Sequence, residues 1–325
     1  MKIFHDVAEF PFPGREVFCT IGMFDGVHRG HQHLIDLTLA RTRAAKGVSL
    51  AITFAPHPAR VVAPAQAPKL IYPPRKRNEI LASKNLDAIW IIPFDQAFSR
   101  LTGQEFLSLI CERLAPLRLI CVGPDFHFGY RRSGNLALLR SLSDHWQYHV
   151  PEITSFMVDG AEVSSTMIRN FIRRGQFADA SNCLGRPYTL CGEVIEGDHA
   201  GRTIGFPTAN LHPANLELPP LGVYAVRAQS PDGLLQGVMN IGYRPTRDST
   251  QARLLAEAHF FEFAGSLYGK SLSIEPIQFI RPERQFPSLE ALRQQIEADC
   301  RQARELIERP NSIKALETQR LNGFE

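Results

Sequence analysis

A glycine-rich segment with two histidines is the first candidate for chemistry. Residues Gly22 to His31 read Gly-Met-Phe-Asp-Gly-Val-His-Arg-Gly-His, between an apolar run and a helical pattern. Glycines let the backbone approach a ligand closely, and the N-terminus of the following helix suits a phosphate. His28 and His31 are three apart in the first helical turn, so both can reach that phosphate. The segment lacks the P-loop and dinucleotide-binding patterns, and a plain turn with two surface histidines is the alternative.

A second candidate phosphate site begins another predicted helix, where the sequence reads Ser-Ser-Thr-Met-Ile-Arg from Ser164 to Arg169. Arg169 follows Ser165 by four residues and Thr166 by three, so the three side chains share one face of the helix. They lie at the positive end of the helix dipole, where they could clamp the β- and γ-phosphates of a nucleotide. Hydroxyl side chains at this place are also ordinary N-caps.

The C-terminal half holds a third set of candidates. The segment from Gly201 to Leu211 contains Thr208 and Asn210, which share a face in an extended chain. Their hard neutral oxygens suit Mg²⁺ that is held jointly with ATP phosphates. Further on, Glu257 lies in a strand-like run. In a pocket it could act as a general base toward a hydroxyl, although a strand carboxylate can simply face solvent.

The elements that carry these residues follow two different rhythms. Residues 17–180 alternate short apolar runs with helical patterns, which predicts a parallel sheet covered by helices. Thr102 and Glu105 have the spacing of a capping box at the start of one helix. The predicted strands and the first predicted helix are Val17–Ile21, Val48–Phe54, Ala88–Ile92, Leu117–Val122 and residues 31–46.

Residues 185–282 instead contain short strand-like runs separated by glycine and proline turns, which predicts an antiparallel β-barrel, with a sandwich as the alternative. A helix is expected after Ser288, and a frayed tail from Pro310. The change of pattern near Leu184–Pro187 predicts two domains, residues 1–184 and 185–325.

Composition narrows the class of protein. The 325 residues favour two domains, and 44% of them are hydrophobic, enough for a core in each. The 36 Lys and Arg against 33 Asp and Glu leave a net charge of +3, and the β-rich half shows no interleaved basic and aromatic residues. Both facts argue against nucleic acid as a partner. No run approaches the ~20 apolar residues of a membrane span, and the N-terminus lacks a signal-peptide pattern, so we expect a soluble, cytoplasmic protein.

The six cysteines are widely scattered and have no metal-binding or redox spacing, which predicts reduced, mostly buried thiols.

The motifs of the N-terminal half resemble those of the H-x-G-H nucleotidyltransferases. The C-terminal half is similar to riboflavin kinase in the run Gly-Arg-Thr-Ile-Gly-Phe-Pro-Thr-Ala-Asn from Gly201, in Arg244-Pro245-Thr246, in Glu257 and in Arg281-Pro282-Glu283. With Gly123-Pro124-Asp125-Phe126 also present, the whole chain resembles the bifunctional bacterial riboflavin kinase/FAD synthetase family (FMN adenylyltransferase). The match spans almost all of residues 15–305.

This resemblance implies two ATP-dependent reactions, the phosphorylation of riboflavin to FMN by the C-terminal module and the adenylylation of FMN to FAD by the N-terminal module. It implies that Glu257 is the base of the kinase, that Thr208 and Asn210 bind Mg²⁺, and that His28 and His31 stabilise the α-phosphate. Arg169 completes the catalytic set. The expected partners are riboflavin, FMN, FAD and ATP, with no membrane and a monomer or weak homo-oligomer. The expected nucleotide-binding residues are Gly22, Phe24, Asp25, Gly26, Gly30, Ser165, Thr166, Gly201, Arg202 and Gly205, and the expected flavin-binding residues are Asp125, Phe126, Arg281 and Glu283.

Two departures from the family pattern stand out. Met23 occupies a position that often holds Asn, and the segment Arg247–Ala252 is longer than usual and lacks glycine. Two other hypotheses stay open: only one of the two activities is functional, or the chain is a non-catalytic flavin-binding regulator. The regulator would be expected to have lost Glu257, His28, His31 or Arg169, and all four are present.

Overall fold

The structure, a computed structural model, describes residues 1–196, 205–213, 215–230, 233–246, 249–263 and 265–308, with the backbone alone at 245–246 and 249–252. The chain divides into two compact units, Met1–Ser165 and Thr166–Glu325, and each is described by itself. None of the helices in the described ranges is long and apolar enough to cross a bilayer.

The first unit is built on a five-stranded sheet in the order β1-β4-β3-β2-β5, with every pairing parallel, as the sequence predicts. The edge strand β1 was not predicted, because a three-residue strand with two exposed side chains carries no pattern. The strands are β1 (Lys2–Phe4), β2 (Val17–Ile21), β3 (Val48–Ala55), β4 (Ala88–Pro93) and β5 (Leu117–Cys121).

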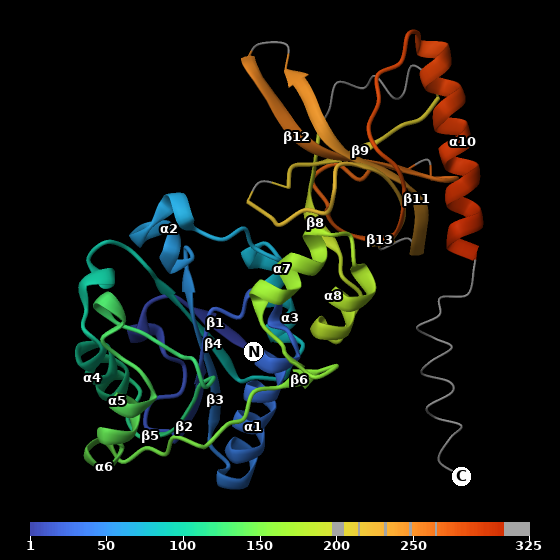
Figure 1. The fold of residues 1–325 in the computed structure, drawn as a ribbon. Helices are drawn as coiled ribbons and strands as arrows, with labels where there is room; N and C mark the ends of the chain where they lie inside the picture. The colour runs from blue at the N-terminus through green and yellow to red at the C-terminus, as the bar shows by residue number, and fades with distance from the viewer. Residues whose placement is uncertain (197–204, 214, 231–232, 247–248, 264, 309–325) are drawn as a thin grey trace, which may run out of the picture. The chain divides into compact units, whose positions relative to one another are not determined.

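Helices cover both faces of this sheet because its strands are apolar on both sides. Phe18 of β2 packs with Leu34 of α1 on one face, whereas Cys19 packs in the cluster that contains Phe106 of α4 on the other. Figure 1 shows α4, α5 and α6 on one side of the strands and α1 on the other. The helices are α1 (Arg29–Ala45), α2 (Pro58–Val62), α3 (Pro74–Ala82), α4 (Gly103–Arg113), α5 (Leu136–Ser141) and α6 (Ser143–Trp146). Short 3-10 turns lie at Val7–Glu9, Asp25–Val27, Pro64–Gln66, Phe98–Arg100 and Tyr130–Arg132, and a small hairpin joins β6 (Met157–Val158) to β7 (Ala161–Glu162).

The predicted capping box of α4 is confirmed. Glu105 donates its backbone N–H to the Thr102 hydroxyl at 3.2 Å, and the Glu105 carboxylate accepts from the backbone N–H of Thr102 at 2.7 Å. These bonds satisfy two donors at the helix end, and the bonds that the carboxylate accepts from the backbone N–H and the hydroxyl of Thr102 lower the pKa of Glu105.

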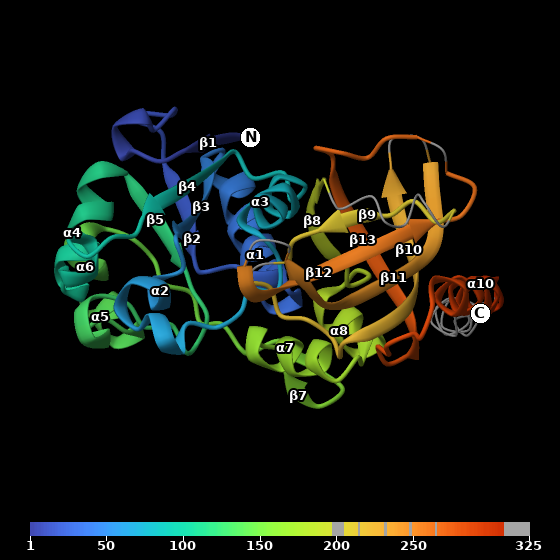
Figure 2. The same cartoon turned by 90° about the horizontal axis from the view of Figure 1, so that it is seen from above.

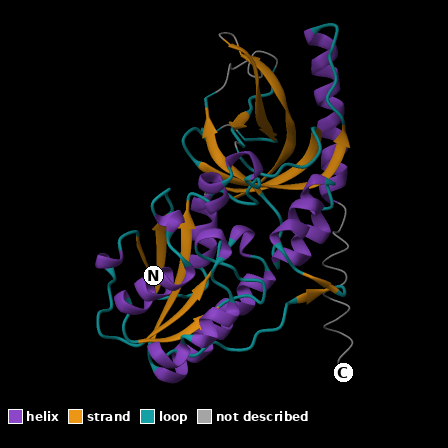
Figure 3. Cartoon of the chain, turned by 60° about the vertical axis from the view of Figure 1, so that its left-hand side comes forward, coloured by secondary structure: helices purple, strands orange, loops and turns teal. Residues whose placement is uncertain are grey.

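The second unit is a closed antiparallel barrel, so the sandwich alternative is excluded. Its strands run in the order β10-β11-β12-β9-β8-β13 and wrap round one another in Figure 2, with α10 against the outside. The same barrel is drawn as orange strands beside a long purple helix in Figure 3. The elements are α7 (Ser165–Arg173), whose first residue belongs to the first unit, α8 (Phe177–Leu184), β8 (Leu190–Ile195), β9 (Ala209–Leu211), β10 (Gly222–Ser230), β11 (Gly233–Thr246), β12 (Ser249–Phe260), β13 (Ser271–Arg281) and α10 (Leu289–Glu308).

The two faces of the barrel wall have different neighbours. Val238 of β11 packs on Ala303 and Ile307 of α10, so this face points outward, toward the helix. Side chains alternate along a strand, so Asn240 lies on the same outer face, whereas Met239 and Ile241, both with 0% exposure, point inward.

Burial governs the chemistry of the cysteines, as predicted. Five of the six are buried and Cys300 is half-buried. Desolvation disfavours the thiolate, which raises the pKa of Cys111 to about 12 and those of Cys121 and Cys300 to about 11, and raises that of Cys19 well above its ordinary value.

We therefore expect the native protein to resist thiol reagents. At pH 8 a chromogenic disulfide reagent should react slowly with Cys300 and not measurably with the other thiols, because the thiolate is the nucleophile. After denaturation all six cysteines of the sequence should react. Rapid reaction of two or more thiols in the folded protein would contradict this account.

Candidate active sites

The glycine-rich turn after β2 has an unusual backbone. Phe24, Gly26 and Val27 all have positive φ angles, of 51°, 78° and 41°. A β-branched residue such as Val27 strongly disfavours this region, so the turn is held in a strained shape by its surroundings. Gln32 of α1 contributes by donating to the Val27 carbonyl at 2.9 Å. Such a preorganised turn can present backbone N–H groups to a phosphate.

The two histidines lie together at the start of α1. Their rings stack with centroids 3.7 Å apart and an interplanar angle of 21°. His28 is the N-cap, and its Nδ1 accepts from the backbone N–H of His31 at 3.4 Å. A neutral His28 therefore carries its proton on Nε2. Gly30 leaves room for this ring, since a Cβ there would lie 3.2 Å from it.

Ser165 meets the glycine-rich turn although it lies 140 residues away in the sequence. Its hydroxyl donates to the backbone carbonyl of Asp25 at 3.0 Å. The Asp25 carboxylate is itself buried and accepts from the backbone N–H of Ile71 at 3.0 Å. The two predicted phosphate motifs thus come together at Ser165. Thr166 and Arg169 belong to the second unit, so their place beside the histidines stays a prediction.

Sequence reasoning missed Arg77, whose buried guanidinium supports the turn. Its Nη1 donates to the carbonyls of Met23 and Phe54 at 3.3 and 3.2 Å. Desolvation lowers its pKa to about 10, while the charge of Asp25 acts in the opposite direction. An arginine four residues before Leu81, on the buried face of α3, was the available signal.

The predicted flavin-binding pair Asp125 and Phe126 follows β5. Since β2 and β5 are parallel neighbours, their carboxyl ends meet at one edge of the sheet. Asp125 is exposed, and the ring of Phe126 stacks on that of Phe128 at 5.3 Å. This loop and the glycine-rich turn therefore lie on adjacent strand ends.

A row of polar side chains crosses three strands of the barrel. Glu257 of β12 is the direct partner of Asn210 on β9 and of Asn240 on β11. Directly opposite residues point to the same face, so all three lie on the outer face of the wall. Thr208 precedes Asn210 by two residues in the chain and is half-buried. The predicted kinase residues are thus brought together by strand register.

The donor set of this row suits Mg²⁺. Thr208 offers a hydroxyl oxygen, Asn210 a buried amide and Glu257 a nearby carboxylate, and Mg²⁺ prefers such hard oxygen ligands. A cavity of about 310 Å³ opens beside Thr208 at the same strands, but Ala209, Ala258 and Phe260 line it from the inner face of the wall, opposite to that of Asn210 and Glu257. Gly205 has a φ of +88°, which favours glycine. Gly201 and Arg202 lie outside the described residues.

Arg244 is a second residue to which sequence reasoning gave no role. It donates from Nε at 3.1 Å and from Nη2 at 2.7 Å to one oxygen of Glu257. The hydrogen bond to this carboxylate raises the pKa of Arg244. These two bonds fix the orientation of the Glu257 carboxylate.

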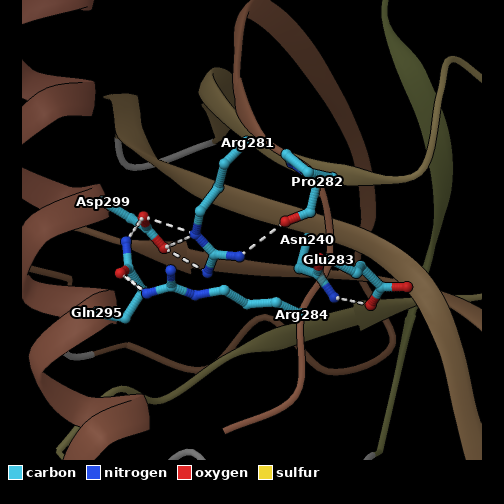
Figure 4. Close-up of polar contacts among 7 residues, drawn as sticks. All are labelled: Asn240, Arg281, Pro282, Glu283, Arg284, Gln295 and Asp299. Carbon is cyan, nitrogen blue, oxygen red and sulfur yellow. Dashed lines mark hydrogen bonds and ion pairs between the residues drawn. The ribbon is translucent and has the colours of Figure 1, made fainter.

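The predicted flavin-binding residues Arg281 and Glu283 have different surroundings (Figure 4). Arg281 makes an ion pair with Asp299 of α10 at 2.7 Å. Glu283 accepts from Asn240 at 2.9 Å and lies 3.9 Å from Arg244. Glu283 thus extends the row that contains Glu257, whereas Arg281 is tied to the helix.

The family departure at Arg247–Ala252 and the tail from Pro310 fall on residues whose side chains or whole placement lie outside the described parts of the chain.

Comparisons with known proteins match both units. A family model described as FAD synthetase matches residues 13–167, and one described as riboflavin kinase matches residues 184–307. Among solved structures, one titled as the crystal structure of a macrolide-efflux protein from Streptococcus pneumoniae has a TM-score of 0.76 and 27% identity, covering 91% of this chain and 96% of its own.

Curated relatives are similar over almost the whole chain. The bifunctional riboflavin kinase/FMN adenylyltransferase of Escherichia coli (strain K12) is 34% identical over 93% of this chain and 96% of its own length. The protein of the same name from Pseudomonas fluorescens is 35% identical over 90% of this chain and 93% of its own length. The chain therefore belongs to the family of bifunctional riboflavin kinases/FMN adenylyltransferases.

Proposed function

We propose that this chain makes FAD from riboflavin in two steps, each using ATP. The single observation that carries the proposal is that a separate family match falls on each half of the chain. The barrel unit would phosphorylate riboflavin to FMN, and the α/β unit would adenylylate FMN to FAD and release pyrophosphate. The names of the relatives support the same pair of reactions.

In the kinase step, Glu257 accepts the proton of the terminal ribityl hydroxyl, and the oxygen attacks the γ-phosphorus of ATP as ADP leaves. Arg244 orients the carboxylate through two hydrogen bonds. Thr208 and Asn210 would hold Mg²⁺, which neutralises charge on the phosphates. Gly201, Arg202 and Gly205 would bind the nucleotide, and Arg281 and Glu283 the flavin.

In the adenylylation step, a phosphate oxygen of FMN attacks the α-phosphorus of ATP in line, and pyrophosphate leaves. No enzyme nucleophile is needed, so catalysis rests on positioning and charge stabilisation. His28 and His31 would donate to the α-phosphate, with Gly22, Phe24, Asp25, Gly26 and Gly30 forming the turn around it. Ser165, Thr166 and Arg169 would bind the leaving phosphates, and Asp125 and Phe126 the flavin.

Incubation of the pure protein with riboflavin, ATP and Mg²⁺, followed by separation of the flavins, tests the proposal. Both FMN and FAD are expected. If only FMN forms, or if FAD forms only when FMN is supplied, then only one of the two modules is functional. If neither product forms, the chain is the non-catalytic regulator. We expect the enzyme to work in the cytoplasm as a monomer or weak homo-oligomer, without nucleic acid or membrane.

Replacement of the base tests the kinase site. Glu257→Gln keeps the shape of the side chain but removes the proton acceptor, so FMN formation should slow by about 10²–10⁴-fold. FAD formation from supplied FMN should persist. Glu275→Gln, at a half-buried glutamate of β13, is the matched control and should be harmless. Undiminished FMN production by Glu257→Gln would refute the assignment.

The stacked histidines can be tested in the same way. Loss of one positioned transition-state donor is worth about 10²–10³-fold, so His28→Ala or His31→Ala should slow FAD synthesis by that factor and spare FMN synthesis. His33→Ala, on the same helix, should change neither rate. The role fails if a variant lacking both His28 and His31 still makes FAD at the normal rate.

The sequence predicts a domain boundary at 184/185, whereas the second compact unit of the structure begins at Thr166. Two fragments can therefore be made, one beginning at each place. Phe177 stacks on Tyr188 at 5.9 Å, and Arg173 donates twice to the buried carboxylate of Glu217. Fragments that begin at either place should make FMN and no FAD. The fragment that begins at Thr166 should unfold at the higher temperature, because it keeps these contacts. A folded fragment that binds riboflavin without making FMN would contradict the two-module division.

A further inference from the structure

A buried carboxylate on α10 anchors the segment that follows β13. Asp299 is only 2% exposed, and Arg281 donates to it from Nε at 2.9 and 3.1 Å and from Nη2 at 2.7 Å. Gln295, one turn earlier on the helix, adds a bond to Asp299 at 2.7 Å. A charge so deeply buried persists only where it is paired, and here its partner comes from the end of a barrel strand.

The segment is held to the helix at a second point. Arg284 donates to the side-chain oxygen of Gln295, and the guanidinium groups of Arg281 and Arg284 both lie over the ring of Phe286, at 5.7 and 4.9 Å from its centroid. Arg281 also donates to the carbonyl of Pro282 at 3.0 Å. The backbone on both sides of Glu283 is therefore fixed.

Glu283 itself points the other way, as Figure 4 shows: Arg281 and Arg284 reach toward α10, whereas Glu283 reaches toward Asn240. Gly242 has no side chain to block this approach, since a Cβ there would overlap the Glu283 carboxylate. Arg244 lies between the two carboxylates, bonded to Glu257 at 2.7 Å and 3.9 Å from Glu283.

We propose that Asp299 is a positioning residue of the kinase site: through Arg281 it holds the segment after β13 so that Glu283 stays on Asn240 and Arg244, next to Glu257. The inference rests on the proposed kinase function and adds to it a residue on a helix outside the barrel wall. Asp299 contacts no reacting atom in this scheme, and its effect passes entirely through the placement of Glu283.

A double-mutant cycle between Asp299→Asn and Glu283→Gln tests the inference. Each single change should lower kcat/KM for riboflavin by about 10–100-fold, because a small displacement of a group that positions the substrate slows the reaction by about that factor. If Asp299 acts through Glu283, the double variant should be no worse than the poorer single variant. Effects that multiply would show that the two residues act independently and would overturn the proposal.

The control cycle pairs Arg304→Met with Glu283→Gln. Arg304 joins the same helix to Glu262 by an exposed ion pair at 3.2 Å, so its loss should leave kcat/KM unchanged and show no coupling. If Asp299→Asn does not fold, Gln295→Leu takes its place in the cycle, with the same two outcomes; it removes one bond to Asp299 and also the bond by which Arg284 holds the same segment to the helix. Wild-type protein that makes no FMN would instead refute the proposed function itself.

Discussion

The pairing of β12 with its two neighbours is the constraint on which the kinase site depends. The register sets Glu257 opposite Asn210 on one side and Asn240 on the other. Because side chains alternate between faces, a slip of one residue would turn Glu257 into the barrel, where Ala256 and Ala258 now lie fully buried. The apolar interior therefore specifies the register, and the register in turn assembles the polar row.

Arginines hold the shape of both sites. Arg77 ties the glycine-rich turn to the end of β3, Arg244 links two carboxylates of the polar row, and Arg281 joins the barrel to α10. A planar guanidinium offers five donors in a fixed arrangement, so one side chain can satisfy acceptors on different elements. Arg77 and Arg281 are largely buried, so losing the partner of either would leave an uncompensated polar group in the interior.

The site of the α/β unit depends on a strained backbone turn, whereas the polar row of the barrel depends on strand register. The positive φ angles of Phe24 and Val27 are costly for these residues, and neighbouring bonds from Gln32, Arg77 and Ser165 hold the turn nonetheless. A turn that is already formed needs little further ordering when a phosphate arrives, which favours a reaction that depends on placement rather than on covalent chemistry.

Local patterns in the sequence determined the two rhythms of the fold, the capping box at Thr102 and the histidine pair at the start of α1, because neighbours along the chain decide these features. The sequence motifs also identified Glu257 and Asn210 as candidate site residues, and the segments that contain them were predicted to be extended. Only the tertiary structure decided that these two are direct partners, that Ser165 reaches the carbonyl of Asp25, and that Arg77 and Asp299 are buried under the sites. Such contacts join residues far apart in sequence through packing and strand register, and no local periodicity encodes them.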